Sequence, residues 1–143
     1  MKRSVFVAVF SVMALSAFAI PRGLTDKPVE QLASLLNKPV PEGFTRMSRE
    51  AYYQTGDIVD GLLLQKGLAV ENGLVRLVTF VWQSNDYEKM LRLAGELYDL
   101  LDQYDLTVMQ EGDRSIYTVD GHTLILDSVQ QEGRTYAFSL GLH

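Results

Sequence analysis

The sequence contains no cysteine and only two histidines, His122 and His143. Without cysteine the chain has no disulfides, no thiol nucleophile and no cysteine ligands for zinc or an iron–sulfur cluster. A zinc site takes three or four ligands, so two imidazoles suffice only if carboxylates converge on them. We therefore expect no metal and no cofactor, and a fold that is held together by the burial of apolar side chains.

The motifs of common catalytic chemistry are missing as well. No Gly-x-Ser-x-Gly nucleophile elbow is present, and the glycines are scattered among predicted turns rather than grouped in a phosphate-binding loop. Asp99, Asp102 and Asp105 recur at helical spacing, but the glycine and closing glutamate of an EF-hand calcium loop are absent. We interpret these carboxylates as a solvated helix face and predict that the protein is not an enzyme.

Positive charge is scarce, because 13 lysines and arginines face 18 aspartates and glutamates, for a formal net charge of −5. Nucleic acids and anionic membrane surfaces both favour a basic protein face. The composition therefore argues against nucleic acid as a partner and favours solubility.

The longest apolar run lies at the N-terminus. Lys2 and Arg3 precede an apolar stretch with serines, and Ala17 and Ala19 place small residues where a signal peptidase cleaves. The stretch is shorter than the roughly 20 residues that span a bilayer, and Pro21 follows it. The sequence predicts a removed signal peptide over residues 1–19, one domain over 20–143, export to the periplasm or the extracellular space, and no stable membrane insertion after signal removal.

Residues 85–104 predict one long amphipathic helix. At about 100° per residue, one side is apolar and the opposite side is charged. The apolar stripe consists of Tyr87, Met90, Leu91, Ala94, Leu97, Tyr98 and Leu101. Asn85, followed three residues later by Glu88, resembles a capping box at the helix start. A shorter helix is predicted between about Thr25 and Asn37, where two prolines soon prevent its continuation.

Period-two patterns predict strands on both sides of the long helix. Two precede it, over residues 61–70 and 74–82, and four follow it, over 106–109, 115–119, 123–129 and 135–142. Residues 40–58 fit either a strand or a short helix. The sequence therefore predicts an α+β fold of order α-β-β-α-β-β-β-β, with a single antiparallel sheet of about six strands packed against one long amphipathic helix and one shorter N-terminal helix.

The dipeptide Asn72-Gly73 predicts the first hairpin. A two-residue turn places Val70 and Leu68 beside Val75 and Leu77, whereas a three-residue turn that includes Glu71 places them beside Leu74 and Arg76. We prefer the two-residue turn because it keeps Arg76 off the apolar side of the sheet.

The strand over residues 74–82 provides the strongest indication of function, because it is apolar on both sides. Such a strand is usually central in its sheet and covered twice. If the long helix covers Val75, Leu77 and Val81, the other side is either covered by the first helix and residues 40–58 or open as a groove. Aromatic side chains near a core more often pack than bind. The candidate ligand-binding residues are Val78, Phe80, Trp82, Tyr52 and Tyr53.

These patterns together predict a small exported binding or interaction module of the cell envelope. Its partner would be an envelope protein, a peptide or a small apolar ligand, held on a sheet face or edge. One alternative is a small hydrolase that uses convergent carboxylates or His122, which requires at least two titratable groups in one pocket. Another is a structural or inhibitory partner of a larger envelope protein.

Overall fold

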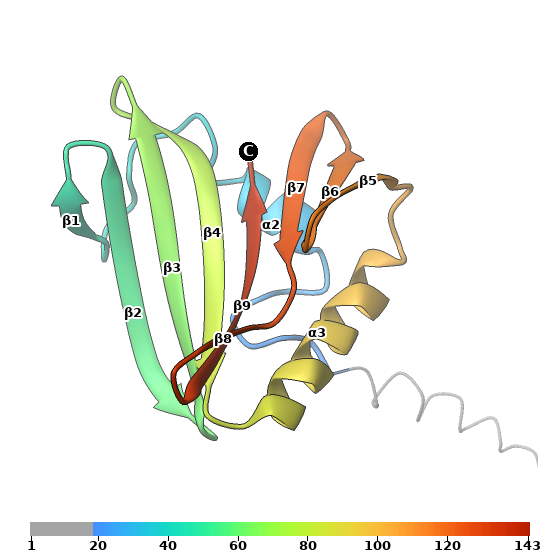
Figure 1. The fold of residues 1–143 in the computed structure, drawn as a ribbon. Coiled ribbons are helices and arrows are strands. Elements are labelled where there is room, and N and C mark those ends of the chain that lie inside the picture. The colour runs from blue at the N-terminus through green and yellow to red at the C-terminus, as the bar shows by residue number, and fades with distance from the viewer. Residues whose placement is uncertain (1–18) are drawn as a thin grey trace, which may run out of the picture.

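A computed structural model describes residues 19–143, and a single sheet dominates it (Figure 1). The sheet has nine antiparallel strands in the order β1-β2-β3-β4-β9-β7-β6-β5, with β8 pairing along β9. The strands are β1 (Thr45–Ser48), β2 (Ala51–Val59), β3 (Leu62–Glu71), β4 (Leu74–Ser84), β5 (Thr107–Glu111), β6 (Arg114–Val119), β7 (His122–Asp127), β8 (Gln130–Glu132) and β9 (Thr135–Leu142). The predicted signal peptide lies outside the described residues except for Ala19.

The predicted arrangement of about six strands with one long and one shorter helix is wrong, because residues 19–143 form mostly sheet, with nine strands and two short helices. Helix α2 spans Pro28–Ala33 and helix α3 spans Tyr87–Leu101. Residues 40–58 supply β1 and β2, and β8 comes from a segment predicted as a turn. Strand β2 lacks a clear apolar alternation because it lies near the edge of the sheet, where none of its side chains is buried.

Helix α3 begins one residue later than the capping-box pattern indicates. Asp86 is the N-cap, and its carboxylate accepts a hydrogen bond of 3.1 Å from the main-chain N–H of Lys89. This bond satisfies one of the N–H groups that a helix leaves unpaired at its start. Asp86 therefore takes the capping role that the pattern assigns to Asn85.

The two-residue turn at Asn72-Gly73 is confirmed, because Glu71 pairs with Leu74 and both turn residues have positive φ. This is the backbone conformation that favours Asn-Gly in tight hairpins. Beyond Val70, which faces Val75 as expected, the register shifts and Leu68 pairs with Val78 instead of Leu77. The irregularity puts Val75 and Val78 both in the core, so the predicted grouping of Val75 with Leu77 is wrong.

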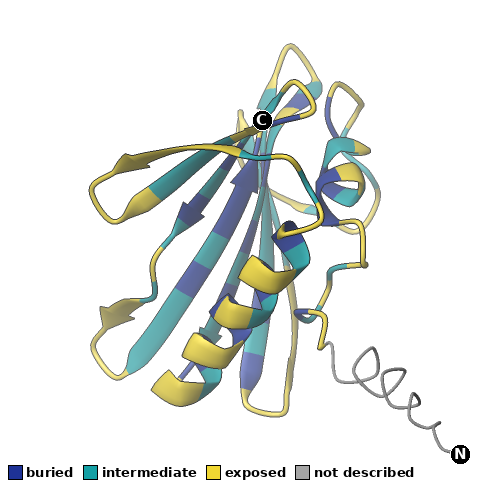
Figure 2. Cartoon of the chain, turned by 90° about the vertical axis from the view of Figure 1, so that its right-hand side faces the viewer, coloured by how far each residue is buried: buried dark blue, intermediate teal, exposed yellow. Residues whose placement is uncertain are grey.

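Strand β4 lies in the middle of the sheet, between β3 and β9, as predicted. Its Phe80 and Trp82 are fully buried, and the Trp82 ring stacks on Phe138 of β9 with 6.1 Å between ring centroids. Helix α3 lies over this side and buries five residues of its own, so the buried positions gather beneath it (Figure 2). The helix covers the Val78, Phe80 and Trp82 side of β4, the reverse of the side predicted for it.

Residues 19–24 close the same side of the sheet. The indole Nε1 of Trp82 donates a 2.8 Å hydrogen bond to the carbonyl of Arg22. The Arg22 guanidinium donates in turn to the carbonyls of Leu62 and Asp57, each at 2.6 Å. The polar edge of the buried indole is thereby satisfied, and the segment is tied to β2, β3 and β4.

Tyr104, just after α3, joins the two helices. Its hydroxyl donates a hydrogen bond to the Glu30 carboxylate on α2 and accepts one of 3.3 Å from the N–H of Val29. Burial raises the pKa of Tyr104 above its usual range, and the bond to Glu30 raises it further. The same bond lowers the pKa of Glu30. Within residues 19–143, neither helix is long and apolar enough to cross a membrane.

Replacement of Tyr104 by phenylalanine tests this junction. The loss of the hydroxyl should lower the free energy of unfolding by roughly 1 kcal/mol at pH 7. Because the pKa of Glu30 is lowered in the folded state, its contribution is present above about pH 4.5 and is lost as the pH falls through the folded-state pKa. Urea unfolding at pH 7 and pH 3 should give a smaller difference between the two proteins at pH 3. Equal differences at both pH values would contradict this role.

Candidate functional site

The structure separates the five candidate residues predicted from the sequence. Val78, Phe80 and Trp82 are at most 1% exposed and lie in the core beneath α3. Tyr52 is half-buried, faces the same side and packs against the core, since it pairs with Leu68. Tyr53 points to the opposite side of the sheet, where it pairs with Gly67. Only Tyr53 is therefore on the side that the helices leave uncovered.

That uncovered side is the candidate site, and we call it the open face. It consists of the side chains of β2, β3, β4 and β9 that point away from α3. By register these are Ala51, Tyr53, Thr55, Ile58, Leu63, Gln65, Gly67, Ala69, Glu71, Leu74, Leu77, Thr79, Val81, Gln83, Ala137, Ser139 and Gly141. Thr55, Ile58 and Glu71 are exposed, Gly141 is buried, and the others are half-buried. Within residues 19–143, both helices and the segment at Arg22 lie on the other side.

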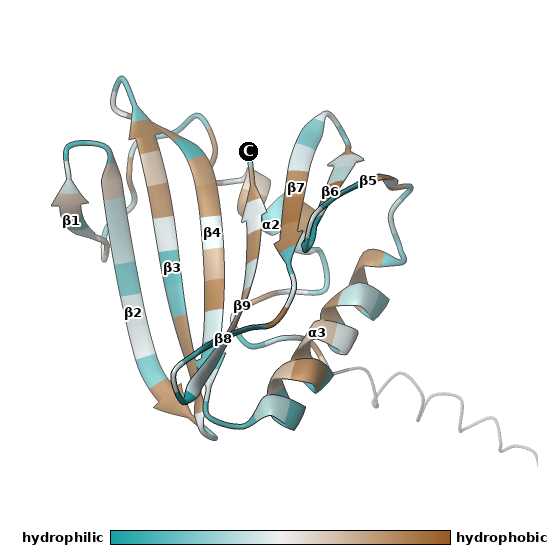
Figure 3. Ribbon diagram, viewed as in Figure 1, coloured by the Kyte–Doolittle hydropathy of each residue, from teal (hydrophilic) through white to brown (hydrophobic). Residues whose placement is uncertain are grey.

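By register, Glu71 at the turn end of β3 is the charged side chain of the open face, although charged residues make up 22% of the chain. The carboxylate of Asp127 on β7 adjoins it and accepts a 2.9 Å hydrogen bond from Ser139. Strand β4 is coloured apolar or neutral over most of its length (Figure 3). Charges begin at the margins, where Arg114 bonds to Asp127 at 3.0 Å and Arg76 reaches Glu71 at 3.6 Å. The open face is thus a mostly uncharged area on a protein whose surface is otherwise acidic.

Small residues make the centre of the open face shallow. Gly67 on β3 and Gly141 on β9 flank Thr79 of the central strand. A Cβ atom placed at Gly141 would come within 3.7 Å of the Leu77 side chain and 3.8 Å of the Thr79 hydroxyl. With glycine there, the side chains of β4 lie over the backbone of β9. The arrangement suits contact with another flat protein surface.

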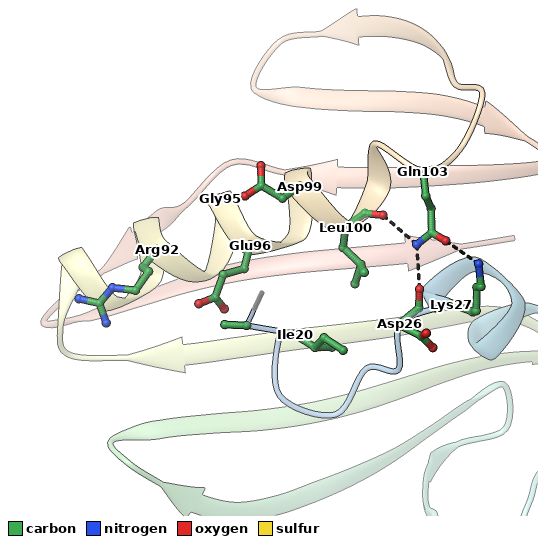
Figure 4. Close-up of a pocket in the computed structure, with 10 residues that line it drawn as sticks. Ile20, Asp26, Lys27, Arg92, Gly95, Glu96, Asp99, Leu100 and Gln103 are labelled. Carbon is green, nitrogen blue, oxygen red and sulfur yellow. Dashed lines mark hydrogen bonds between the residues drawn. The ribbon is translucent and has the colours of Figure 1, made fainter. Parts of the chain in front are cut away.

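A cavity of about 830 Å³ lies on the other side of the molecule, between α3 and the N-terminal segment (Figure 4). Ile20 and Leu100 form apolar parts of its wall, and Arg92, Glu96 and Asp99 project from α3 around it. Gln103 bridges the two segments, because it donates to the carbonyl of Asp26 at 2.8 Å and accepts from Lys27 at 2.9 Å. The lining mixes both charges with apolar groups, and this mixture defines no single ligand class.

Among the residues that line this cavity, Glu96 has a shifted pKa. Partial burial raises the pKa of its carboxyl above the usual 4.5, and the positive charge of Arg92 offsets part of the rise. The neighbouring carboxylate of Asp99 is exposed. Among residues 19–143 no group of three or more histidine, aspartate or glutamate side chains is placed to hold a metal ion.

The two histidines do not form a pair. His143 exchanges two main-chain hydrogen bonds with Thr123, the residue next to His122. Since neighbouring residues of a strand point to opposite sides of a sheet, the imidazoles of His122 and His143 project away from each other. His122 pairs with buried Val119 on the helix side.

No family model, curated protein or solved structure matches this chain.

The open face has a weak signal in the sequence. Ala137, Ser139 and Gly141 alternate with large apolar residues in the last strand, and Gly67 and Ala69 do the same in β3. Small, uncharged residues on one side of adjacent strands suit either a covered layer or a contact surface. Periodicity alone does not distinguish these, because it gives no information about which side receives the helix.

Replacement of Glu96 by glutamine tests the electrostatics of the cavity. Because the folded-state pKa of Glu96 is raised, its ionisation weakens the folded state as the pH rises above about 4.5. The variant should be more stable than the natural protein at pH 7, by less than about 1 kcal/mol, with the advantage vanishing near pH 4. Thermal unfolding at the two pH values measures it, and a variant that is less stable at pH 7 would show that Glu96 is stabilised by its surroundings.

Proposed function

We propose that this protein is an exported binding module of the cell envelope, and that its open face docks a partner protein. The observation that carries the proposal is that the side of β2, β3, β4 and β9 without helices carries a charged side chain by register only at Glu71, next to the hairpin turn. Apolar surface there is supplied by Tyr53, Leu63, Leu77 and Val81. Contiguous apolar surface is typical of interaction sites. Export rests on the sequence pattern of residues 1–19.

The size of the open face supports a protein as the partner. Strands lie about 4.8 Å apart and rise about 3.3 Å per residue, so four strands over eight residues cover on the order of 500 Å². A stable protein interface buries about 800 Å² per partner. The open face therefore supplies more than half of the area that a specific complex requires. Ile125 of β7 and Ile116 of β6 adjoin it on the same side, next to the Arg114–Asp127 ion pair.

The shape of the open face also favours a protein over a small ligand. Small molecules bind in concave sites that bury most of their surface. The large cavity at α3 and two smaller ones near Arg22 all lie on the helix side of the sheet. The open face instead offers a broad, shallow area, on which a second sheet or a helix face can pack.

A lysine at the centre of the open face tests the proposal. Val81→Lys places a charge between Gln65 and Ser139, whereas the matched control Leu91→Lys places the same charge on the outer side of α3, where Leu91 is 46% exposed. Affinity capture from an envelope extract should recover the same partner with the natural protein and with the control. The Val81 variant should recover at least about tenfold less, because formation of the complex would remove the added charge from water.

Two further measurements make this result decisive. Thermal unfolding should give closely similar melting temperatures for both variants, since Val81 and Leu91 each lie outside the core. Equal capture by both variants, or no partner dependent on Val81, would contradict the proposal. Concentration-dependent self-association that Val81→Lys abolishes would assign the open face to a second copy of the chain instead.

A further inference from the structure

The two edges of the sheet differ in how well they are protected. Edge strand β1 has only four residues, contains Arg46 and is irregular between Arg46 and Ser48. Bulges, basic side chains and short length are the usual means by which proteins protect an edge from further pairing. Edge strand β5 is also short, with five residues, but it holds no lysine, arginine or proline, and it pairs with β6 in unbroken register.

Strand β5 is also exposed along its whole length. All five of its residues are exposed, and Val108 and Met109 remain 57% and 59% exposed. Because neighbouring residues alternate, one of these two side chains lies on each side of the sheet. Among residues 19–143, β5 pairs with β6 and with no other strand. A strand of this kind is a template for the addition of another strand.

The β5–β6 turn shows which main-chain groups are free. Glu111 pairs with Arg114 across the two-residue turn Gly112-Asp113. In such a hairpin the closing pair exchanges both main-chain hydrogen bonds, and every second residue does the same. Thr107, Met109 and Glu111 therefore point their N–H and C=O groups toward β6. Those of Val108 and Gln110 point outward.

We propose that the free edge of β5 binds an extended segment of a partner protein, in which lysine or arginine residues flank alternating apolar residues. The negative charge around β5 is the reason for expecting a basic segment. Asp105 lies before β5, and Glu111 and Asp113 lie at its other end, all three exposed. The nearby Arg114 is engaged by Asp127 at 3.0 Å. An added strand thus meets apolar side chains at the centre and unpaired carboxylates at both ends.

The same charges disfavour a second copy of the chain on this edge. In a two-fold antiparallel pairing centred on Met109, Asp105 of one copy would lie level with Asp113 of the other. Like charges opposite each other weaken strand pairing. A basic segment converts both contacts into favourable ones. This edge is separate from the open face, so binding at either surface can fail without the other.

The test uses two labelled peptides and fluorescence anisotropy with the purified protein. The first peptide is Arg-Thr-Val-Thr-Val-Arg, and its charge-reversed control is Glu-Thr-Val-Thr-Val-Glu. The basic peptide should bind saturably and at least about tenfold more tightly than the acidic one. Its affinity should fall as salt is raised, because the flanking contacts are exposed ion pairs.

Two variants separate strand addition from general attraction. Val108→Pro removes one outward N–H and leaves the hydrogen bonds between β5 and β6 in place. It should lower the affinity for the basic peptide at least about tenfold. The control Met47→Pro places the same ring on the opposite edge strand, β1, and should leave binding unchanged. If Val108→Pro does not fold, the double variant Glu111→Gln and Asp113→Asn decides, because it keeps the strand and should lower the affinity and its salt dependence.

Several outcomes would overturn the proposal. These are the lack of saturable binding of the basic peptide at about millimolar concentration, equal binding by natural and Val108→Pro protein, and equal binding of both peptides. Sedimentation that shows self-association sensitive to Val108→Pro would assign the edge to a second copy. The Val108→Pro protein should still capture the open-face partner. Loss of peptide binding at β5 can therefore be told apart from a failure of the proposed function.

Discussion

The burial of Phe80 and Trp82 on one side of β4 is the constraint on which the rest of the structure depends. Both rings are at most 1% exposed, and the burial of each contributes on the order of 2 to 3 kcal/mol. Strand β4 is central, so whatever covers these rings also covers the middle of the sheet. Helix α3, which follows β4 in the chain, and the segment at Arg22, which precedes it, both cover these rings. The side of β4 on which the two rings lie therefore determines on which side of the sheet the helix and the segment pack.

One consequence is the division of the molecule into two unlike sides. The helix side holds the core and the cavity of about 830 Å³. The open face holds mostly uncharged side chains that are half-buried by their neighbours across the strands. Within residues 19–143, the two helices lie on one side of the sheet and leave the other side uncovered. The open face is the side of the sheet without helices, and β5 is an edge strand because no further strand pairs with it among residues 19–143.

The sequence predicts those elements whose cause is local. Helical period predicts that α3 is amphipathic, although Tyr87, Leu91 and Tyr98 of the predicted stripe are exposed and Leu93 is buried instead. Asn72-Gly73 and Asp120-Gly121 form tight turns in which both residues take positive φ. The long alternation of β9 is visible because Phe138, Leu140 and Leu142 are all buried. Each of these elements is predicted from residues that are close together in the sequence.

The remaining features depend on contacts between distant segments. Both sides of β4 are apolar, so its own residues do not determine which side α3 covers. The irregularity next to Arg76 reflects the pairing of residues 37 and 38 with Val75, where the loop after α2 bonds to β4 at 2.8 and 2.9 Å. Strand β2 is specified by its partner β3 rather than by its own pattern. The candidate residues predicted on β4, Val78, Phe80 and Trp82, therefore lie on its buried side.

The most direct measurement of this account uses the lack of cysteine, because a single introduced thiol reports the exposure of one position. Val81→Cys and Val78→Cys place that thiol on opposite sides of β4, at a half-buried and a fully buried position. Under native conditions, a maleimide reagent should modify the Val81 variant at least about a hundredfold faster, with equal rates in denaturant. Protection of both positions would mean that the open face is covered, and faster labelling at position 78 would mean that the two sides of the sheet are reversed.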